Sequence, residues 1–319
     1  MIVVTGAAGF IGSCMVSFLN RKGIDDLIIV DQFEFGLKTK NLDKKRFFKA
    51  IDRTNFISWF QKNANKVTSC IHLGARTDTT CFDRAIFDKL NYAYSISIAQ
   101  ICQENEIPLF YASSAATYGD GSLGYNDQLH PNQLQPLNPY GESKNEFDKW
   151  ILSTDFSSAC LGFKFFNVYG PNEYHKGRMA SVVFHTHNQI HVTGSMKLFK
   201  SHRDDYEDGE QKRDFIYVKD ILKVIWFCMS NHVDSGLYNL GTGQAKSFND
   251  LAKFTFEAQK VSPDIQYMDT PADIRDRYQY FTQADMSKLL AAGYDTPFYS
   301  LEEGITDYVT NYLMPQKYY

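Results

Sequence analysis

The sequence opens with Met1-Ile-Val-Val-Thr-Gly-Ala-Ala-Gly-Phe-Ile-Gly12, in which an apolar run leads into glycines at positions 6, 9 and 12. The residues that follow, Ser13 to Lys22, predict a helix. A strand that ends in a glycine-rich turn before a helix lets a pyrophosphate approach the backbone and the free N–H groups of the helix start. We interpret the stretch as a phosphate-binding turn. Its spacing, G-x-x-G-x-x-G, differs from the simplest dinucleotide fingerprint and also permits an ordinary loop.

A second feature of dinucleotide-binding sequences follows at the expected distance. The apolar run Leu27–Val30 ends in Asp31, nineteen residues after Gly12. An acidic residue about twenty positions beyond the glycines lies at the tip of the next strand, where it meets the adenosine ribose. Together the two features predict that the N-terminal region binds a dinucleotide.

The composition is that of a globular chain with a substantial core. Of its 319 residues, 44% are hydrophobic and 22% are charged, and the net charge of −4 gives no basic signal for nucleic acid or an anionic membrane. The six scattered cysteines, without a C-x-x-C pair, favour a reducing compartment. No apolar run reaches the roughly eighteen residues of a membrane span, and a strand that begins at residue 2 leaves no room for a signal peptide. We therefore expect a cytoplasmic protein without nucleic-acid or membrane partners.

Short apolar runs alternate with helical patterns, such as Asn91 to Glu104, through the first half of the chain. This alternation predicts an α/β fold, a doubly wound parallel sheet of the Rossmann type, with ligands beyond the carboxyl ends of the strands. The predicted strands are Ile2–Thr5, Leu27–Asp31, Ser69–Gly74, Pro108–Ala112 and Gly162–Phe166. The helices predicted in the C-terminal third are Phe248–Gln259, Ala284–Ala292 and Leu301–Leu313.

Charged and polar residues near the predicted ribose site leave the choice of cofactor open. Asp31 alone favours a free 2′-hydroxyl and hence NAD. Lys38 and Arg53 lie in neighbouring loops, where they either remain solvated or clamp a 2′-phosphate and so admit NADP. Further on, Cys70–Thr77 carries a Gly-Ala turn that lets backbone approach a ligand. Asn91 opens the next predicted helix, where it either caps that helix or contacts the cofactor.

A tyrosine and a lysine one helical turn apart follow a strand end that is rich in small hydroxyl residues. Pro139 suits a helix start, so Tyr140 and Lys144 lie on one face of that helix. A phenol titrates near about 10, and a neighbouring ammonium and a bound nicotinamide cation would both favour the phenolate. Tyr140 is then a usable base near neutral pH. In the preceding stretch Leu109–Gly119, hydroxyl residues such as Ser114 either terminate the strand or bind a ligand.

These motifs resemble those of the extended short-chain dehydrogenase/reductase superfamily. The resemblance rests on Thr5–Gly12, Ser113–Gly119 and the Tyr140-x-x-x-Lys144 pair. It implies that Ser114 hydrogen-bonds the substrate hydroxyl, that Tyr140 is the acid/base and that Lys144 holds the nicotinamide ribose.

Further motifs are similar to those of one family in that superfamily, the ADP-L-glycero-D-manno-heptose 6-epimerases, and the similarity covers nearly the whole chain. Two features depart from the family pattern. Arg178 stands where the family usually has serine, and the loop 200–211 is longer than the family's. The similar motifs are His175–Ser181, Lys197–Phe199, Lys212–Val218, Asn239–Gly243 and Arg277–Asp285.

The resemblance also implies a domain organisation. Phe165–Pro171 marks the usual start of the superfamily's substrate domain. A dinucleotide-binding domain is therefore expected over 1–166 with a returning segment around 213–243. A smaller mixed α/β domain over 167–319 would mainly bind substrate.

The implied reaction interconverts ADP-D-glycero-β-D-manno-heptose and ADP-L-glycero-β-D-manno-heptose at C6, with bound NADP, or NAD as the alternative. The C6–H bond is not acidic, so transient oxidation replaces simple proton abstraction. Tyr140 would serve one epimer and Lys176 the other, while Ser114 polarises the oxygen. The residues alone equally allow Lys176 to be a phosphate-binding cation. The resemblance further implies that Arg213 and Tyr278 hold the nucleotide part of the substrate, since arginine pairs bidentately with a diphosphate and tyrosine offers an apolar face with a hydroxyl. The residues alone also allow Tyr278 to be a packing residue, one of twenty tyrosines in the chain.

No metal site is predicted, because the histidines between 175 and 202 have no accompanying cysteine or ordered carboxylate set. The candidate site residues form two sets, one for the cofactor and one for the substrate. The expected cofactor contacts are Gly6, Gly9, Phe10, Ile11, Gly12, Asp31, Gln32, Lys38, Arg53, Leu73, Gly74, Ala75, Arg76, Thr77, Asn91, Tyr140, Lys144, Val168 and Lys176. The expected substrate contacts are Ser114, Asn167, Arg178, His185, Phe199, Lys200, Ser201, His202, Arg213 and Tyr278.

Three other functions fit parts of the pattern. A UDP-sugar 4-epimerase or related oxidoreductase differs in the base that its nucleotide pocket accepts. A non-catalytic dinucleotide sensor can lose the tyrosine or lysine of Y-x-x-x-K, and this chain keeps both. A reductase would consume NADPH rather than regenerate it. The resemblance further implies a small-molecule nucleotide-sugar substrate, a role in lipopolysaccharide core biosynthesis and a homo-oligomer, which in the family is a pentamer.

Overall fold

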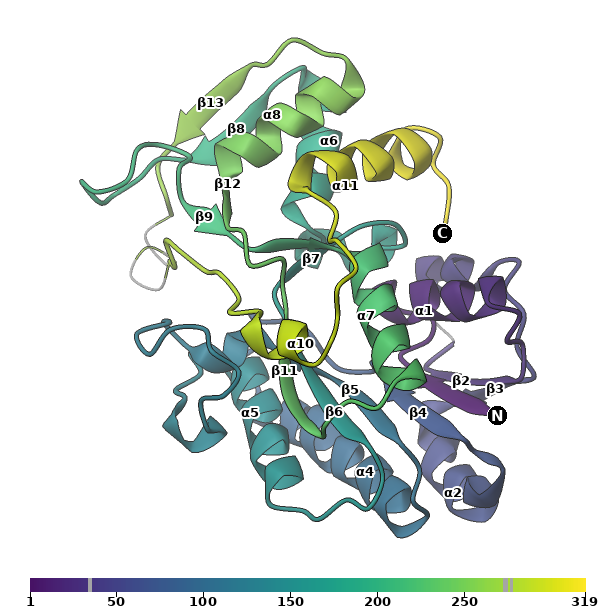
Figure 1. Cartoon of the computed structure of the whole chain (residues 1–319). Coiled ribbons are helices and arrows are strands. Elements are labelled where there is room, and N and C mark those ends of the chain that lie inside the picture. Colours follow the sequence, from purple (N-terminus) through teal and green to yellow (C-terminus); the bar gives the residue numbers. More distant parts are fainter. Residues whose placement is uncertain (34–35, 272–274, 276–277) are drawn as a thin grey trace.

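A seven-stranded parallel sheet forms the centre of the molecule (Figure 1). The computed structural model describes residues 1–33, 36–271, 275 and 278–319. The strand order is β11-β6-β5-β4-β1-β2-β3, so the order reverses between β1 and β4. At such a switch point an open sheet leaves a crevice at the carboxyl ends of its strands. The strands are β1 (Ile2–Thr5), β2 (Leu27–Asp31), β3 (Lys49–Asp52), β4 (Ser69–His72), β5 (Leu109–Ser114), β6 (Cys160–Phe165) and β11 (Gly236–Leu240).

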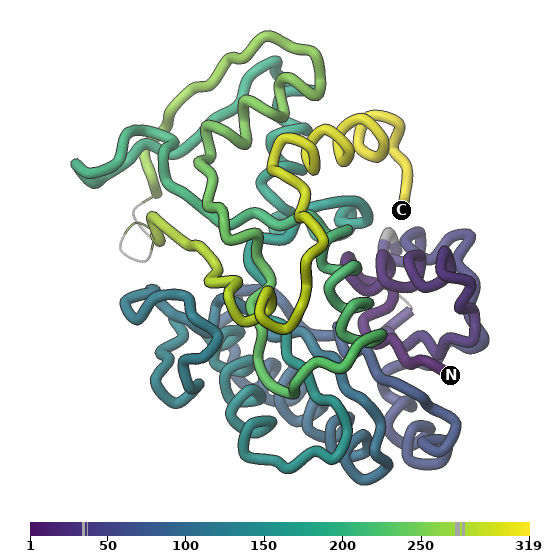
Figure 2. The backbone as a smooth tube through the Cα atoms, viewed as in Figure 1, coloured from purple at the N-terminus to yellow at the C-terminus, as the bar shows by residue number. Residues whose placement is uncertain are grey.

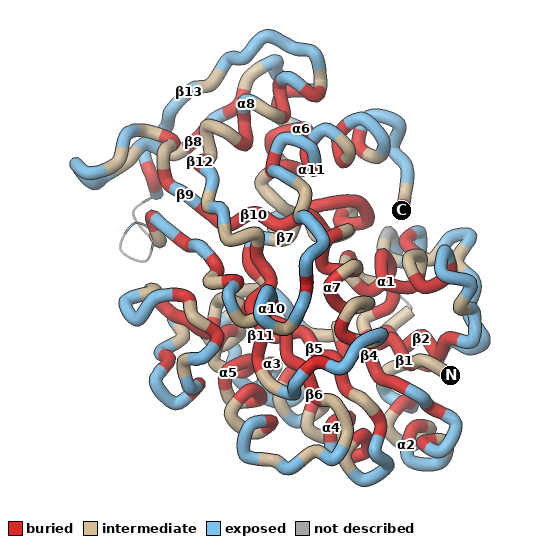
Figure 3. The backbone as a smooth tube through the Cα atoms, in the orientation of Figure 1, coloured by how far each residue is buried: buried red, intermediate tan, exposed pale blue. Residues whose placement is uncertain are grey.

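Helices cover both faces of this sheet, and the strands are buried on both sides (Figure 3). Successive strand residues point to opposite faces, so Val4 joins the core beneath α1 and α7, whereas Val3 joins the core beneath α2, α4 and α5. The helices of this part are α1 (Phe10–Arg21), α2 (Arg53–Asn63), α3 (Arg84–Phe87), α4 (Tyr94–Glu104), α5 (Pro139–Leu152) and α7 (Val218–Ser230).

Most of the remaining elements pack beyond the carboxyl ends of the sheet (Figure 2), whereas the short helix Ser287–Ala291 packs against strand β11 of the sheet. There α6 and α11 pack against α8, and β8 pairs in parallel with β13. The helices are α6 (Val182–Thr193), α8 (Phe248–Gln259), α10 (Ser287–Ala291) and α11 (Leu301–Tyr308). The short strands are β7 (Asn167–Tyr169), β8 (Met196–Phe199), β9 (Lys212–Arg213), β10 (Phe215–Tyr217), β12 (Lys246–Ser247) and β13 (Ile265–Met268).

The five predicted strands are all present: β1 and β2 have the predicted bounds, and β4, β5 and β6 have ends displaced by one or two residues. Strands β3 and β11 have no counterpart among the predicted ranges. The first helix begins at Phe10 rather than Ser13, and the predicted helix Ala284–Ala292 is shorter, at Ser287–Ala291. Arg277, which opens one of the family-like motifs, lies outside the described residues. Within the described part of the chain, no helix combines the length and the apolar character that crossing a membrane requires.

Candidate active site

The glycine-rich turn is compact because side chains would collide with backbone at two of its positions. Gly6 has a φ of +66°, and a Cβ on it would lie 2.7 Å from backbone atoms of Gly74. A Cβ on Gly12 would lie 2.1 Å from the carbonyl oxygen of Gly6. Gly9 is the N-cap residue of α1 and offers no side chain to the N–H groups of the first turn. These N–H groups, at the positive end of the helix dipole, suit a pyrophosphate.

We expect Gly6→Ala to abolish cofactor retention and to lower the free energy of unfolding. The positive φ costs about 1–2 kcal/mol for alanine, and crowding against Gly74 adds about 1–3 kcal/mol. Gly23→Ala is the matched control, because Gly23 has a φ of +80° with no atom within 4 Å of its Cβ position. Urea unfolding and the absorbance of bound cofactor measure both effects. Equal losses in the two variants would refute the steric role of Gly6.

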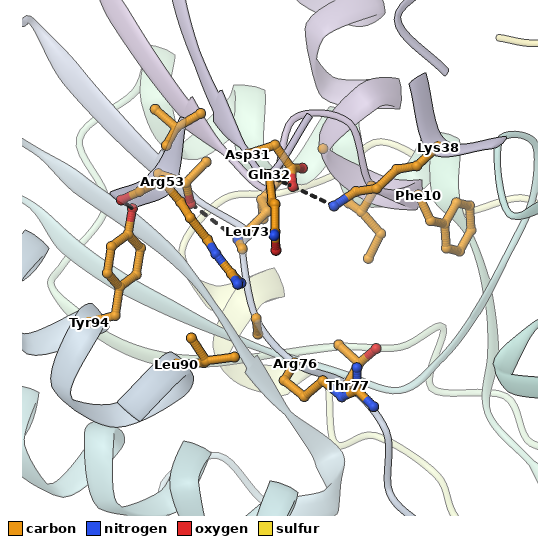
Figure 4. Close-up of a pocket in the computed structure, with 18 of the residues that line it drawn as sticks. Phe10, Asp31, Gln32, Lys38, Arg53, Leu73, Arg76, Thr77, Leu90 and Tyr94 are labelled. Carbon is orange, nitrogen blue, oxygen red and sulfur yellow. Dashed lines mark hydrogen bonds and ion pairs between the residues drawn. The ribbon is translucent and has the colours of Figure 1, made fainter. Parts of the chain in front are cut away.

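A cavity of about 770 Å³ lies at the carboxyl ends of β1, β2 and β4 (Figure 4). The close-up shows Asp31, Gln32, Lys38 and Arg53 on one side of this cavity, across from Arg76 and Thr77. The expected cofactor residues among its lining are Gly6, Gly9, Phe10, Ile11, Gly12, Asp31, Gln32, Lys38, Arg53, Leu73, Gly74, Ala75, Arg76, Thr77 and Lys176. The other expected cofactor residues, which do not line it, are Asn91, Tyr140, Lys144 and Val168.

The carboxylate of Asp31 is engaged by the protein on both of its oxygens. Oδ2 accepts a hydrogen bond from the backbone N–H of Ala8 at 2.9 Å, and Oδ1 accepts one from that of Gln32 at 2.7 Å. The ammonium of Lys38 forms an ion pair with Oδ1. Asp31 therefore braces the glycine-rich turn, and its negative charge is balanced by a lysine that also lines the cavity.

Asn91 does not cap a helix, contrary to one of its two predicted roles. The helical stretch begins earlier, at Arg84, and Asn91 lies inside it, fully buried. Its side-chain amide accepts from the N–H of Arg76 at 2.8 Å and donates to the carbonyl of Arg76 at 2.9 Å. It also donates to Ser143 Oγ at 3.1 Å, and Ser143 donates to the carbonyl of Tyr140 at 2.7 Å. Asn91 thus connects the cavity loop to the first turn of α5.

Ser114, Tyr140 and Lys144 meet where β5 ends against α5. The Ser114 side chain lies close to Tyr140 and acts to lower the pKa of its phenol, and Ser114 Oγ accepts a hydrogen bond from the N–H of Ala116 at 3.1 Å. Lys144 is buried, and its Nζ donates to the carbonyl of Ala112 at 2.7 Å. Asn138 caps α5, and Pro139 is its first residue, as the sequence predicts. The predicted acid/base pair and the hydroxyl therefore form one cluster.

The protein alone does not bring the pKa of Tyr140 down, contrary to the expectation for a neighbouring ammonium. Burial raises that pKa, and the neighbouring Ser114 side chain only opposes the rise. Burial also lowers the pKa of Lys144 to about 8, which weakens the ammonium that was expected to favour the phenolate. Desolvation therefore outweighs the i, i+4 charge effect at this site.

Lys176 lies at the N-terminus of α1. Its Nζ is 5.3 Å from the centre of the Phe10 ring, and Phe10 is the first residue of that helix. Burial lowers the pKa of Lys176, and the neighbouring Glu173 opposes this shift. A partly buried amine beside the glycine-rich turn fits either predicted role, an acid/base or a cation for phosphate.

Arg178 is one of the expected substrate contacts, but it lines the cavity that the expected cofactor residues form. It does not join the expected substrate residues from Phe199 onward. Its guanidinium donates to the hydroxyl of Thr80 and lies 3.5 Å from Asp78 Oδ1, in the loop after β4. Arg178 and Asp78 both line the cavity. On α6, the Nε2 of His185 lies 3.4 Å from the carbonyl of Arg178, so this histidine adjoins the same turn. Asn167 and Val168 lie on β7, where the N–H of Asn167 donates to the carbonyl of Asp214 at 3.0 Å.

A second cluster, the arginine–tyrosine cluster, is formed by Arg213, Tyr278, Tyr280 and Phe199. Arg213 is only 8% exposed, and its guanidinium lies 5.5 Å from the centre of the Tyr278 ring. It donates to two backbone carbonyls, those of Lys212 and Gln279, and no carboxylate among the described residues pairs with it. Tyr278 packs edge-on against both Phe199 and Tyr280. A buried cation that pairs with no carboxylate of the described residues fits an anionic ligand.

The long loop 200–211 packs beside this cluster. Its predicted substrate residue His202 pairs with the hydroxyl of Tyr280 at 2.9 Å, through Nδ1. Ser201 Oγ donates to the carbonyl of Arg203 at 2.8 Å, and Lys200 forms an exposed ion pair with Asp269 at 3.3 Å. Ser201 Oγ also lies 3.5 Å from the hydroxyl of Tyr280, so both His202 and Ser201 contact the aromatic side chains, whereas Lys200 pairs with the exposed Asp269.

The histidines of α6 do not assemble a metal site. His187 and His191 stack at 6.2 Å, and burial lowers the pKa of His187 to about 4. Over residues 1–33, 36–271, 275 and 278–319, no group of three His, Cys, Asp or Glu side chains could hold a metal ion.

Comparisons with known proteins show which family the chain resembles along its length. The profile of the NAD dependent epimerase/dehydratase family matches residues 2–241. A protein of Fusobacterium nucleatum named ADP-L-glycero-D-manno-heptose-6-epimerase is 46% identical, and the alignment covers 100% of both chains. The crystal structure of the Helicobacter pylori protein of that name is 28% identical, with a TM-score of 0.81 over 97% of this chain and 95% of the other.

A structure with different chemistry shares the fold as closely. The UDP-N-acetylglucosamine 4-epimerase of Methanobrevibacter ruminantium is 23% identical, with a TM-score of 0.85 over 99% of this chain and 98% of the other. The fold alone therefore does not identify the sugar substrate. Sequence identity over the full length does separate the two families, at 46% for the heptose epimerase relative and 23% for the UDP-sugar epimerase structure. The chain belongs to the NAD dependent epimerase/dehydratase family and, within it, to the ADP-L-glycero-D-manno-heptose-6-epimerases.

Proposed function

We propose that this chain interconverts ADP-D-glycero-β-D-manno-heptose and ADP-L-glycero-β-D-manno-heptose at C6 by transient oxidation and reduction. The observation that carries the reaction type is the grouping of Tyr140, Ser114 and buried Lys144 where β5 ends against α5, with Lys144 Nζ donating to the carbonyl of Ala112 at 2.7 Å. The sugar is supported by relatives of that name at 41–46% identity over nearly the full chain. A nicotinamide dinucleotide is the cofactor class of the family.

The residues of the chain fit that cofactor and divide the work of catalysis. The glycine-rich turn and the N-terminus of α1 would hold the pyrophosphate, and Lys144 the nicotinamide ribose. When bound, the nicotinamide supplies reversible acceptance of hydride. Tyr140 takes the C6 hydroxyl proton of one epimer and restores it, while Ser114 holds the oxygen. We assign Lys176 the same task for the other epimer, because burial lowers its pKa towards the range of a base.

The arginine–tyrosine cluster would bind the nucleotide end of the substrate. Arg213 presents a planar, buried guanidinium to a diphosphate, and the face of Tyr278 packs against the nucleoside. The neighbouring residues Phe199 and His202 complete this surface. This division assigns cofactor binding to 1–166 with 213–243, and substrate binding mainly to the rest of 167–319.

We propose NADP as the cofactor, because Lys38 neutralises Asp31 at the expected ribose site. Lys38→Met should weaken NADP binding by roughly 10- to 150-fold, the value of a charge-assisted hydrogen bond of about 1.5–3 kcal/mol, and should change NAD binding much less. Calorimetric titration of cofactor-stripped protein with both dinucleotides measures the two affinities. Lys40→Met, an exposed substitution on the same turn, is the control. Equal weakening of NAD and NADP would contradict a 2′-phosphate clamp.

Activity on two substrate classes tests the function. The protein as purified, without added NAD(P)H, is incubated with ADP-D-glycero-β-D-manno-heptose or with UDP-glucose, and the product is followed by NMR. The proposal predicts inversion at C6 of the heptose and no change in UDP-glucose. Turnover of UDP-glucose alone would favour a UDP-sugar 4-epimerase, and no turnover of either would favour a dinucleotide sensor.

We further expect a cytoplasmic homo-oligomer, pentameric if it follows its family, that acts in lipopolysaccharide core biosynthesis. Size-exclusion chromatography with light scattering gives the number of 36.6 kDa subunits.

A further inference from the structure

A fully buried ion pair lies beneath the Ser114–Tyr140–Lys144 cluster. Lys164 on β6 and Asp148 on α5 are both 0% exposed, and Lys164 Nζ is 2.9 Å from Asp148 Oδ2. Burial of two charges is costly and adds little net stability even when they are paired. Because the pair adds little to stability, its position beneath the Ser114–Tyr140–Lys144 cluster requires another explanation.

The pair is the centre of a hydrogen-bond network that joins three elements. Asp148 accepts hydrogen bonds from the hydroxyl groups of two β5 residues, Tyr111 at 3.0 Å and Ser113 at 2.7 Å. Lys164 donates to Thr117 Oγ1 at 2.6 Å, and Thr117 in turn donates to the carbonyl of Ser114 at 2.8 Å. The network therefore connects α5, which carries Tyr140, to the turn that carries Ser114.

The same carboxylate acts electrostatically on both residues of the Y-x-x-x-K pair. Asp148 follows Lys144 by one helical turn and Tyr140 by two. Its charge raises the pKa of Tyr140 and opposes the lowering of the pKa of Lys144 by burial. The ammonium of Lys164, 2.9 Å from this carboxylate, carries the opposite charge.

Other titratable groups face the network from neighbouring elements. Burial and the charge of Lys144 lower the pKa of His72 to about 3, so this histidine on β4 is neutral. Burial raises the pKa of the other groups, which are Tyr111, Tyr118, Asp127 and Cys160. Lys164 is therefore the cation that directly balances Asp148.

We propose that Lys164 is a positioning residue for the epimerase reaction. Through Asp148 and Thr117 it fixes Ser114 against the first turns of α5, and it limits how strongly Asp148 acts on Lys144. The expected effect of Lys164 on turnover rests on the proposed function, whereas its electrostatic effect on Lys144 does not depend on that function.

Titration of Lys144 in the holoprotein tests the proposal without substrate. The Lys144 signal is followed by NMR of ¹³C-labelled lysine and assigned with Lys144→Met. Asp148→Asn removes the negative charge that raises the Lys144 pKa and should therefore move this pKa below its value in the unmodified holoprotein. Lys164→Met leaves the carboxylate without its ammonium and should move that pKa upward, whereas Lys164→Arg should restore it. Lys149→Met, on the same helix but paired with exposed Glu146, should change nothing.

The catalytic part predicts a kcat lowered by roughly 10²-fold in Lys164→Met, since misplacement of a reacting group by about 1 Å costs that much, and near-normal kcat in Lys164→Arg. If Lys164→Met does not fold, the double variant Lys164→Met/Asp148→Leu removes both charges and should fold. In it the Lys144 pKa should equal that in Asp148→Asn, and kcat should be lowered. Unchanged titrations, shifts in one common direction, or wild-type kcat and titration in the double variant would overturn the proposal. If the protein does not act on the heptose, the Lys144 titration still tests the electrostatic effect of Lys164, because it needs no substrate.

Discussion

Replacing Tyr140 with Phe should lower kcat by about 10²- to 10⁴-fold, the usual contribution of general acid/base catalysis, while the protein keeps its cofactor. The substitution removes only the hydroxyl near Ser114 and leaves the ring, which packs edge-on against Phe87 at 6.4 Å. Folding should therefore be little affected. Turnover of the ADP-heptose by NMR and the absorbance of bound cofactor give the two quantities.

Two other variants sharpen this test. Tyr294→Phe is the matched control, because the hydroxyl of Tyr294 is buried and has no partner among the described residues. Lys176→Met should impair conversion in one direction more than the other, and Tyr140→Phe should show the opposite bias. A Tyr140→Phe enzyme with full activity would remove Tyr140 from the mechanism, and an unbiased Lys176→Met enzyme with weaker cofactor binding would make Lys176 a phosphate-binding cation.

Replacing Arg213 with Met should raise the Kd for ADP by roughly 10- to 150-fold, because a hydrogen bond to a charged group contributes about 1.5–3 kcal/mol. The Tm should change little, since Arg213 donates to backbone carbonyls. Its loss leaves no carboxylate in the described part of the chain without a partner. Calorimetric titration with ADP and a thermal melt without nucleotide measure these effects.

The control for this variant is Arg46→Met, an exposed arginine that pairs with Asp25 at 2.8 Å. That substitution should leave ADP binding unchanged. An Arg213→Met protein that binds ADP normally, or one that unfolds at a much lower temperature, would show that the buried guanidinium serves the fold rather than the diphosphate.

The parts of the site that could be predicted from sequence are those that depend on local geometry. The glycines at 6 and 12 are demanded by close backbone approach, which leaves a spacing in the sequence. Tyr140 and Lys144 share one helix, so their separation follows from the helical period. Strand β3 escaped prediction because it is a short edge strand with an exposed Lys49 and no apolar alternation.

The parts that could not be predicted depend on contacts between distant segments or on burial. Arg178 reaches Thr80, 98 residues earlier, so no local pattern shows where its guanidinium points. Desolvation decides the pKa of Tyr140, and burial cannot be measured from spacing alone. The pair of Asp148 and Lys164 did leave a signal, because Asp148 continues the helical spacing of Lys144, and Lys164 is a charge inside the apolar strand Cys160–Phe165.

The central claim is that hydrogen leaves C6 of the nucleotide sugar and returns to the same carbon. The most direct measurement is turnover of ADP-D-glycero-β-D-manno-heptose deuterated at C6, in ordinary water and without added NAD(P)H, followed by NMR. The account predicts an inverted C6 that keeps its deuterium, because the hydride is never exchanged with solvent. Inversion with loss of deuterium to water, or no inversion at all, would contradict it.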